Sequence, residues 1–174
     1  MTVTPRDEAR ACGFTRPAIR RRIVGGTWEE VAPRVYRIVA ALPIDWRQLL
    51  LALTLASGGL AAGESAAALY DLLSAPARHE IVLHRRPYVE LDALVRTTSE
   101  LPTIDRTRVG CIPATNPTRT IIDLAAAGWQ IYRLIIIGSV ARYVKPCSSR
   151  CGAGAKRRRS PAIERPRAGY PGSQ

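Results

Sequence analysis

The residues with the clearest chemistry are arginines in the segment GFTRPAIRRRIVGG, residues 13–26. Four of them, Arg16 and Arg20 to Arg22, fall within seven residues. The planar guanidinium group can donate two hydrogen bonds at once, to guanine O6 and N7 in the DNA major groove or to phosphate oxygens. The free backbone amides of a helix capped by Thr15 could also hold a phosphate. The segment therefore predicts a DNA-contacting helix, with an ordinary solvated helix face as the alternative.

The spacing of apolar residues predicts which arginines of this helix are exposed. Ile19 and Ile23 are four residues apart and share one helix face, which we expect to pack inward together with Phe14. Arg22 lies near the edge of that face. Most of the other arginines would contact phosphate and position the helix rather than identify bases. The expected exposed basic surface consists of Arg16, Arg20 and Arg21.

Residues that could support catalysis or hold a metal are few. Cys147 and Cys151 have CxxxC spacing but no second cysteine pair and no nearby histidine, so we expect no zinc site. His79 and His84 lie on either side of the strand expected at 80–83, and we expect both at the surface. Neither has a carboxylate or serine at a spacing that indicates catalysis. Arg119 and Asp123, four apart on an expected helix, favour a structural ion pair. We therefore expect no catalytic residue, no cofactor and no enzymatic activity.

The net charge of the 174-residue chain is +12, and most of it belongs to the C-terminal end. Residues 129–174 carry ten Lys or Arg and one Glu, whereas residues 46–128 carry eight Arg and eight acids. The KRRR run at 156–159 would attract any polyanion without specificity. The high overall charge therefore says little about the arginine segment near the N-terminus.

The sequence has no feature that indicates a membrane or an export route. No apolar run reaches the ~18 residues that a helix needs to cross a bilayer. The N-terminus opens with polar and acidic residues and lacks the pattern of a signal peptide. We therefore expect a cytoplasmic protein whose cysteines are free thiols.

Two short helices joined by a tight turn are expected at the start of the chain. The first has Thr4 as its N-cap and runs to Cys12. The second is capped by Thr15 and ends at the glycine pair Gly25-Gly26. This order of elements is typical of a helix-turn-helix.

A β-hairpin directly after the second helix would complete a winged helix-turn-helix domain, which we assign to residues 1–42. Strands are expected at residues 27–28 and 35–39. Trp28 and Tyr36, one on each strand, are expected in the core. Arg37 either reaches a phosphate or is solvated. The predicted DNA-binding residues are Thr15, Arg16, Arg20, Arg21 and Arg37.

Residues 43–128 are expected to form a second, mixed α/β domain. Helices come first and strands follow with spacing that suggests antiparallel pairing, which is typical of an α+β fold. After Gly128 the composition shifts to Arg, Ser, Gly and Pro, so residues 129–174 are expected to be a basic, disordered tail. The expected helices span residues 45–56, 64–73 and 117–127, and the expected strands span 80–83, 91–97, 107–111 and 112–115.

Three segments together resemble the AbiEi family, the antitoxins of type IV toxin–antitoxin systems. GFTRPAIRRRIVGGTWEEVAPRVYRI at 13–38 is similar to the N-terminal winged-helix module of that family. GESAAALYDL at 63–72 is similar to the family's Ser-Ala-Ala helix. VGCIPATNPTRTIIDLAA at 109–126 resembles its Gly-Ile-Pro-Val-Thr-x-Pro-x-Arg-Thr-Leu-Leu-Asp-Leu-Ala segment. The likeness covers about residues 4–128.

The resemblance implies an N-terminal domain that binds DNA and represses its own operon, followed by an antitoxin domain. The implied partners are operator DNA and a nucleotidyltransferase-type toxin encoded beside the gene. Relatives with a similar layout carry a repair-like endonuclease, which needs an Asp and a Glu-x-Lys pair to hold a metal. Residues 129–174 contain Glu164 as their only acid and no Glu-x-Lys, which argues against catalysis.

The chain departs from the family pattern at several points. The family has one more helix before Thr4, relatives tend to be basic where Glu29-Glu30 would repel phosphate, and Arg34 replaces the glycine of a Pro-Gly-Val-Tyr turn. The likeness ends at Gly128, which suggests a truncated chain with a shifted reading frame or a decayed gene end; translating the other two frames tests this hypothesis. Two alternatives stay open: a toxin-binding module without significant DNA affinity, and a truncated relative of a helix-turn-helix–endonuclease fusion.

Overall fold

The structure, a computed structural model, describes residues 3–40 and 43–129 and has an α+β fold. The described part holds five α-helices, one short 3-10 helix and two β-sheets. The expected α+β class is confirmed, whereas the predicted disordered tail lies outside the described residues beyond Trp129. The helices are α1 (Arg6–Ala11), α2 (Arg16–Val24), α3 (Trp46–Ser57), α4 (Gly63–Leu69) and α5 (Pro117–Ala126), and the 3-10 helix is η1 (Thr103–Asp105).

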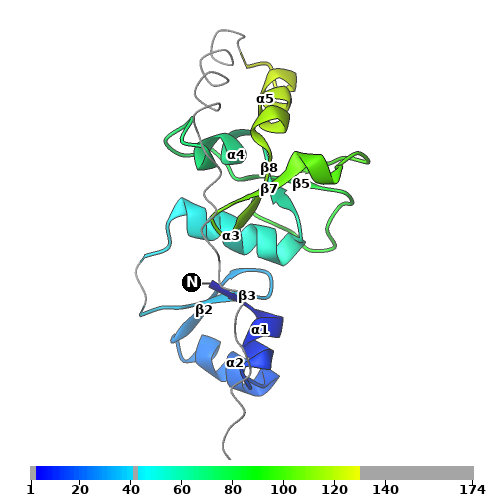
Figure 1. Cartoon of the computed structure of the whole chain (residues 1–174). Helices are drawn as coiled ribbons and strands as arrows, with labels where there is room; N and C mark the ends of the chain where they lie inside the picture. Colours follow the sequence, from blue (N-terminus) through cyan, green and yellow to red (C-terminus); the bar gives the residue numbers. More distant parts are fainter. Residues whose placement is uncertain (1–2, 41–42, 130–174) are drawn as a thin grey trace, which may run out of the picture.

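The elements are stacked in layers along the length of the molecule (Figure 1). Helices α1 and α2 lie at one end and cover a three-stranded sheet. Helix α3 lies between this sheet and a five-stranded sheet, and α4 and α5 lie at the opposite end. The arginine segment of α2 is therefore at one tip of the molecule, far from α5.

The three-stranded sheet consists of β1 (Val3–Pro5), β2 (Trp28–Ala32) and β3 (Val35–Ile38) in the order β1-β3-β2, with both pairs antiparallel. Strand β1 corrects the prediction that Thr4 caps a helix. Thr4 pairs with Tyr36 in the sheet, and Pro5 is the N-cap of α1. Pairing with a strand more than thirty residues away thus outweighs the local preference of threonine for a helix cap.

Helix α2 begins where the sequence predicts. The Thr15 hydroxyl accepts a hydrogen bond from the Ala18 amide at 3.4 Å, and Gly25 is the C-cap. Gly13, with φ of +91°, makes the turn between α1 and α2, and Gly26, with φ of +68°, leads into β2. Both turns need the left-handed backbone that glycine adopts without strain.

The hairpin of β2 and β3 is tight, and Arg34 at its turn has a φ of +64°. A positive φ at this place explains why a glycine suits the corresponding turn of a Pro-Gly-Val-Tyr sequence. The strain at Arg34 is offset locally, because its amide donates a hydrogen bond of 2.7 Å to Glu30 Oε1. Its carbonyl accepts another, of 2.8 Å, from the amide of Arg6.

Helix α3 is buried between the two sheets. A capping box joins Asp45 and Gln48 at its start, and Gly58 in the left-handed conformation ends it. Leu50 and Ala52 are completely buried. One core cluster contains residues of α3 together with Val3, Ala32 and Val35 of the first sheet and Ala61, Ile81 and Ala114 of the second. The core therefore continues past residue 42, where the boundary between two domains is predicted. The division into two domains stays a prediction.

The second sheet has the order β6-β5-β4-β8-β7, and its strands are β4 (Leu60–Ala61), β5 (Glu80–Leu83), β6 (Leu94–Thr97), β7 (Arg106–Val109) and β8 (Ile112–Thr115). The expected antiparallel spacing is wrong for two of the four pairs, since β5 with β6 and β4 with β8 are parallel. The two-residue β4 lies in the middle of the sheet, and a strand this short leaves no periodic pattern in the sequence.

Helices α4 and α5 pack against each other through Ala67 and Leu124. Helix α4 is shorter than predicted because the chain turns at Asp71, whose φ is +58°. The hydroxyl of Tyr70, at its C-cap, donates a hydrogen bond of 2.6 Å to the carbonyl of Thr115 in β8. Burial raises the pKa of Tyr70 to about 12, so this donor stays protonated.

Candidate nucleic-acid interface

Helix α2 carries the arginines that the helical spacing predicts to be exposed. Ile19 is buried, and it packs with Ala9 and Tyr36 in a cluster that Phe14, Ile23 and Trp28 complete. Arg16, Arg20 and Arg21 are exposed; Arg21 lies opposite the apolar face, whereas Arg16 and Arg20 lie beside it. The predicted orientation of the helix is therefore confirmed, and its underside holds it against the first sheet.

Arg22 has a different environment from its two neighbours. Its guanidinium carbon lies 4.7 Å from the centroid of the Phe14 ring and 5.7 Å from that of Trp28. Its Nη1 also donates a hydrogen bond of 3.4 Å to the carbonyl of Ala18. Cation–π contacts of this kind favour a fixed side chain, so Arg22 belongs to the packing of the helix, as its place near the apolar face predicts.

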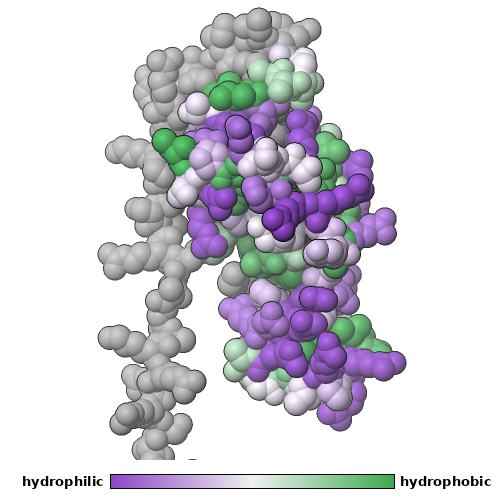
Figure 2. All heavy atoms as spheres, turned by 90° about the vertical axis from the view of Figure 1, so that its right-hand side faces the viewer, coloured by the Kyte–Doolittle hydropathy of each residue, from purple (hydrophilic) through white to green (hydrophobic). Residues whose placement is uncertain are grey.

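The exposed arginines of α2 have no acidic partner in the described part of the chain: neither Arg16, Arg20 nor Arg21 takes part in a salt bridge there. By contrast, ion pairs engage Arg6, Arg37, Arg47, Arg96 and Arg119. Hydrophilic residues also predominate on the face seen in Figure 2 at the end of the molecule that holds α1 and α2. A cluster of guanidinium groups without counter-charges attracts polyanions.

Arg37 is less available than the arginines of α2. Its guanidinium group binds Glu29 Oε2, with distances of 2.8 Å from Nε and 2.7 Å from Nη2. Only 16% of the Arg37 side chain is exposed. To reach a phosphate, Arg37 would have to exchange Glu29 for it, so its place in the DNA-binding set stays a prediction.

The two acids of the hairpin are engaged by protein groups. Glu29 is neutralised by Arg37, and Glu30 accepts the hydrogen bond from the Arg34 amide. Since an ion-paired carboxylate repels an approaching anion less than a free one, Glu29 in particular presents a smaller barrier to phosphate than the sequence suggests.

Two basic residues that the sequence analysis did not select also lie close to α2. Arg6 at the start of α1 and Arg34 at the hairpin turn act on the Tyr36 hydroxyl, as does Arg16. Burial and Glu30 raise the pKa of Tyr36, and these three arginines oppose that rise. The sequence could not reveal this grouping, because it depends on the pairing of β1 with β3.

Arg119 forms a structural ion-pair network at the start of α5. Arg119 lies between Asp123, at 2.9 Å, and Asp105, at 3.1 Å, and these carboxylates raise the pKa of Arg119. The predicted ion pair of Arg119 with Asp123 is thus confirmed.

His79 is partly buried rather than at the surface, and burial lowers its pKa.

Glu80 is a buried carboxylate in the second sheet. Its Oε1 forms an ion pair with Arg96, and its Oε2 accepts a hydrogen bond of 3.3 Å from the Glu64 amide. Burial raises the pKa of Glu80, and Arg96 opposes that shift. The carboxylate lies so close to Gly63 that a Cβ there would be 2.0 Å from Oε2. Gly63 therefore makes room for Glu80 rather than for a ligand.

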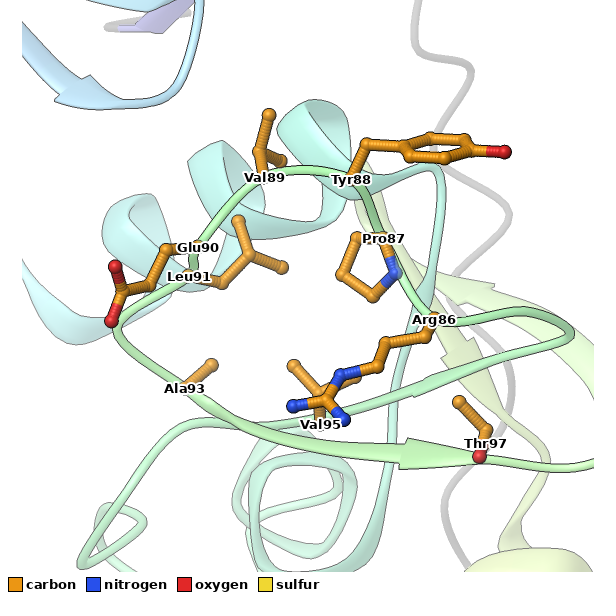
Figure 3. A pocket seen from close by; sticks show the side chains of 9 residues that line it. All are labelled: Arg86, Pro87, Tyr88, Val89, Glu90, Leu91, Ala93, Val95 and Thr97. Atoms are coloured by element: carbon orange, nitrogen blue, oxygen red, sulfur yellow. The ribbon is translucent and has the colours of Figure 1, made fainter.

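The loop between β5 and β6 surrounds a cavity of about 610 Å³ (Figure 3). The fully exposed Tyr88 ring projects away from it, as does Glu90, whereas the Arg86 side chain points into it toward Val95. Over residues 3–40 and 43–129, no group of three or more His, Cys, Asp or Glu could hold a metal ion. The described residues around this cavity thus form no metal site. The arginines of α2 are therefore the stronger candidate for a functional site.

The chain matches no protein-family model and no curated protein. Its function is therefore inferred from its own residues.

No helix within the described ranges is long and apolar enough to cross a membrane. Of the described cysteines, Cys12 is a free, exposed thiol, whereas Cys111 is disulfide-bonded, so the expectation of free thiols is wrong at Cys111.

Proposed function

We propose that this protein is a DNA-binding transcriptional regulator in which α2 enters the major groove of an operator. The observation that carries the proposal is the set of exposed guanidinium groups on α2 that have no acidic partner among the described residues. Arg20 and Arg21 are exposed at the surface, while the buried Ile19 anchors the helix in the core. A rigidly held helix that presents arginines outward suits major-groove binding.

The order of elements around α2 supports a winged helix-turn-helix as the finer description of this unit. The strand–helix–helix–strand–strand order places α2 as the second helix of the helical pair, which is the one that reads DNA in helix-turn-helix proteins. The hairpin of β2 and β3 follows α2 directly and would serve as the wing. The antitoxin role and the neighbouring toxin follow from the resemblance to AbiEi antitoxins and are part of the same proposal.

The proposal is tested by removing two charges from α2. Arg20→Ala combined with Arg21→Ala should weaken binding to duplex DNA from upstream of the gene and make the salt dependence of the affinity less steep. The slope of log affinity against log salt should fall by about one unit for each lost phosphate contact. Fluorescence anisotropy at several salt concentrations measures both quantities.

The matched control is Arg78→Ala combined with Arg85→Ala. Both residues are exposed in the second half of the described chain, far from α2, so this variant loses the same charge. Its affinity should stay close to that of the unaltered protein. Equal losses in the two double variants would attribute binding to overall charge and remove α2 from the interface.

A second candidate function is a protein-interaction module that contacts a toxin without significant DNA affinity. It is favoured by large apolar side chains exposed on the second half of the molecule, in particular Tyr88, Ile104 and Ile122. Co-purification with the product of the neighbouring gene, compared with a gel shift on upstream DNA, separates the two functions. Stable co-purification without any gel shift would favour the interaction module.

A further inference from the structure

A small cavity lies at the edge of the packed face of α2, beside α1 and strand β3 of the first sheet. Its volume is about 200 Å³, which is enough for a phosphate group. Three elements meet around it, α1, α2 and β3. The lining residues are Arg6, Arg16, Ile19, Arg20, Ile23 and Tyr36.

The polar groups around this cavity are mainly hydrogen-bond donors with positive charge. Among the described residues, Arg6 Nε is buried without a hydrogen-bond partner, and it forms an ion pair of 3.6 Å with the largely exposed Asp7. Arg16 and Arg20 contribute two more guanidinium groups. Glu30 is the acid that raises the pKa of the neighbouring Tyr36. Glu30 is held by the amide of Arg34. The cavity therefore has an excess of positive charge, and Arg6 Nε is held there by an ion pair without a hydrogen bond.

Tyr36 supplies a neutral donor at the same place. Tyr36 is buried in the cluster under α2, and it also lines the cavity. Because burial raises its pKa, the hydroxyl keeps its proton at neutral pH and can donate to an anion.

We propose that this cavity is a phosphate-binding pocket that receives one phosphodiester of the DNA backbone, held by Arg6, Arg16 and Arg20 with the Tyr36 hydroxyl. The inference rests on the proposed DNA-binding function and divides the arginines of α2 between two tasks. Those at the cavity fix the register of the helix on the duplex, and Arg21, which does not line it, is left to contact a base edge.

The test measures binding of a duplex from upstream of the gene and of an unrelated duplex, between 50 and 200 mM salt. Arg6→Gln removes the charge of Arg6 but keeps a polar side chain. It should weaken binding of both duplexes by a similar factor, about tenfold, and reduce the salt slope by about 0.9. Arg6→Lys should restore the slope because the charge returns. Tyr36→Phe should weaken binding without changing the slope.

Arg108→Ala is the control, since it removes an exposed arginine from edge strand β7 of the other sheet. Thermal unfolding of each variant establishes that it is folded. The pocket is overturned if Arg6→Gln and Tyr36→Phe both behave like Arg108→Ala while the unaltered protein binds DNA. The proposed function itself fails, and the pocket with it, if the unaltered protein binds neither duplex.

Discussion

Adjacent arginines of α2 have different roles because their side chains meet different surroundings. Arg21 is exposed, whereas Arg22 stacks on Phe14 and Trp28. The helical period alone predicts this difference, since Arg22 lies close to the face that Ile19 and Ile23 define. Arg21 and Arg22 carry the same charge, so substituting each in turn removes the same charge. Comparing the two variants separates the effect on stability from the effect on DNA binding.

We therefore expect Arg22→Ala to lower the free energy of unfolding by about 1 kcal/mol, through loss of its cation–π contacts, with little change in DNA affinity. Arg21→Ala should do the reverse, with stability kept and binding of the upstream duplex weakened. Urea unfolding and fluorescence anisotropy on both variants provide the comparison. Equal effects of the two substitutions on affinity would show that charge alone matters.

The candidate site could be predicted only where local spacing determines it. Thr15, Arg16, Arg20 and Arg21 occupy the positions that a capped helix with an apolar underside gives them. The pairing of Arg37 with Glu29 across the hairpin could not be foreseen, because the strand register decides which side chains are opposite each other. The same holds for Arg6, which reaches the cavity only because β1 joins the sheet.

At the scale of elements, α3 holds the molecule together. It is apolar around most of its circumference, which the run of leucines in the sequence already indicates, and it contacts both sheets. The sequence predicted the helix itself but not its central place, since no local pattern tells which strands cover its two sides. The same limit applies to β4, which joins β5 to β8 with only two residues.

We expect Leu50→Ala to destabilise both sheets together. Leu50 is completely buried in α3, in the cluster that joins the two sheets. The substitution should cost about 2–5 kcal/mol of unfolding free energy, and amide hydrogen exchange should accelerate in β3 as well as in β5. Ile122→Ala, at an exposed position of α5, should change stability by less than about 0.5 kcal/mol.

Faster exchange in only one sheet of the Leu50→Ala variant would show that the two parts unfold separately. That result would favour independent domains on either side of residue 42. Simultaneous acceleration would instead mean that α2 is supported by the whole described core, which suits a helix that must hold its arginines rigidly.

At the scale of the whole molecule, the two ends differ in character. One end carries α1, α2 and the basic cavity, whereas the described part beyond α3 carries seven arginines and eight acids, together with the exposed side chains of Tyr88, Ile104 and Ile122. This division suits a protein that holds DNA at one end and a protein partner at the other. The central claim is that the DNA contact is confined to the α2 end.

A nuclear magnetic resonance titration of the isotopically labelled chain with duplex DNA from upstream of its gene tests that claim most directly. We predict that the largest shifts occur in the backbone amides of Thr15–Val24 and in the Nε resonances of Arg6, Arg16, Arg20 and Arg21, with residues 60–126 almost unchanged. Shifts confined to residues 60–126, or no shift along α2 at low salt, would contradict the account.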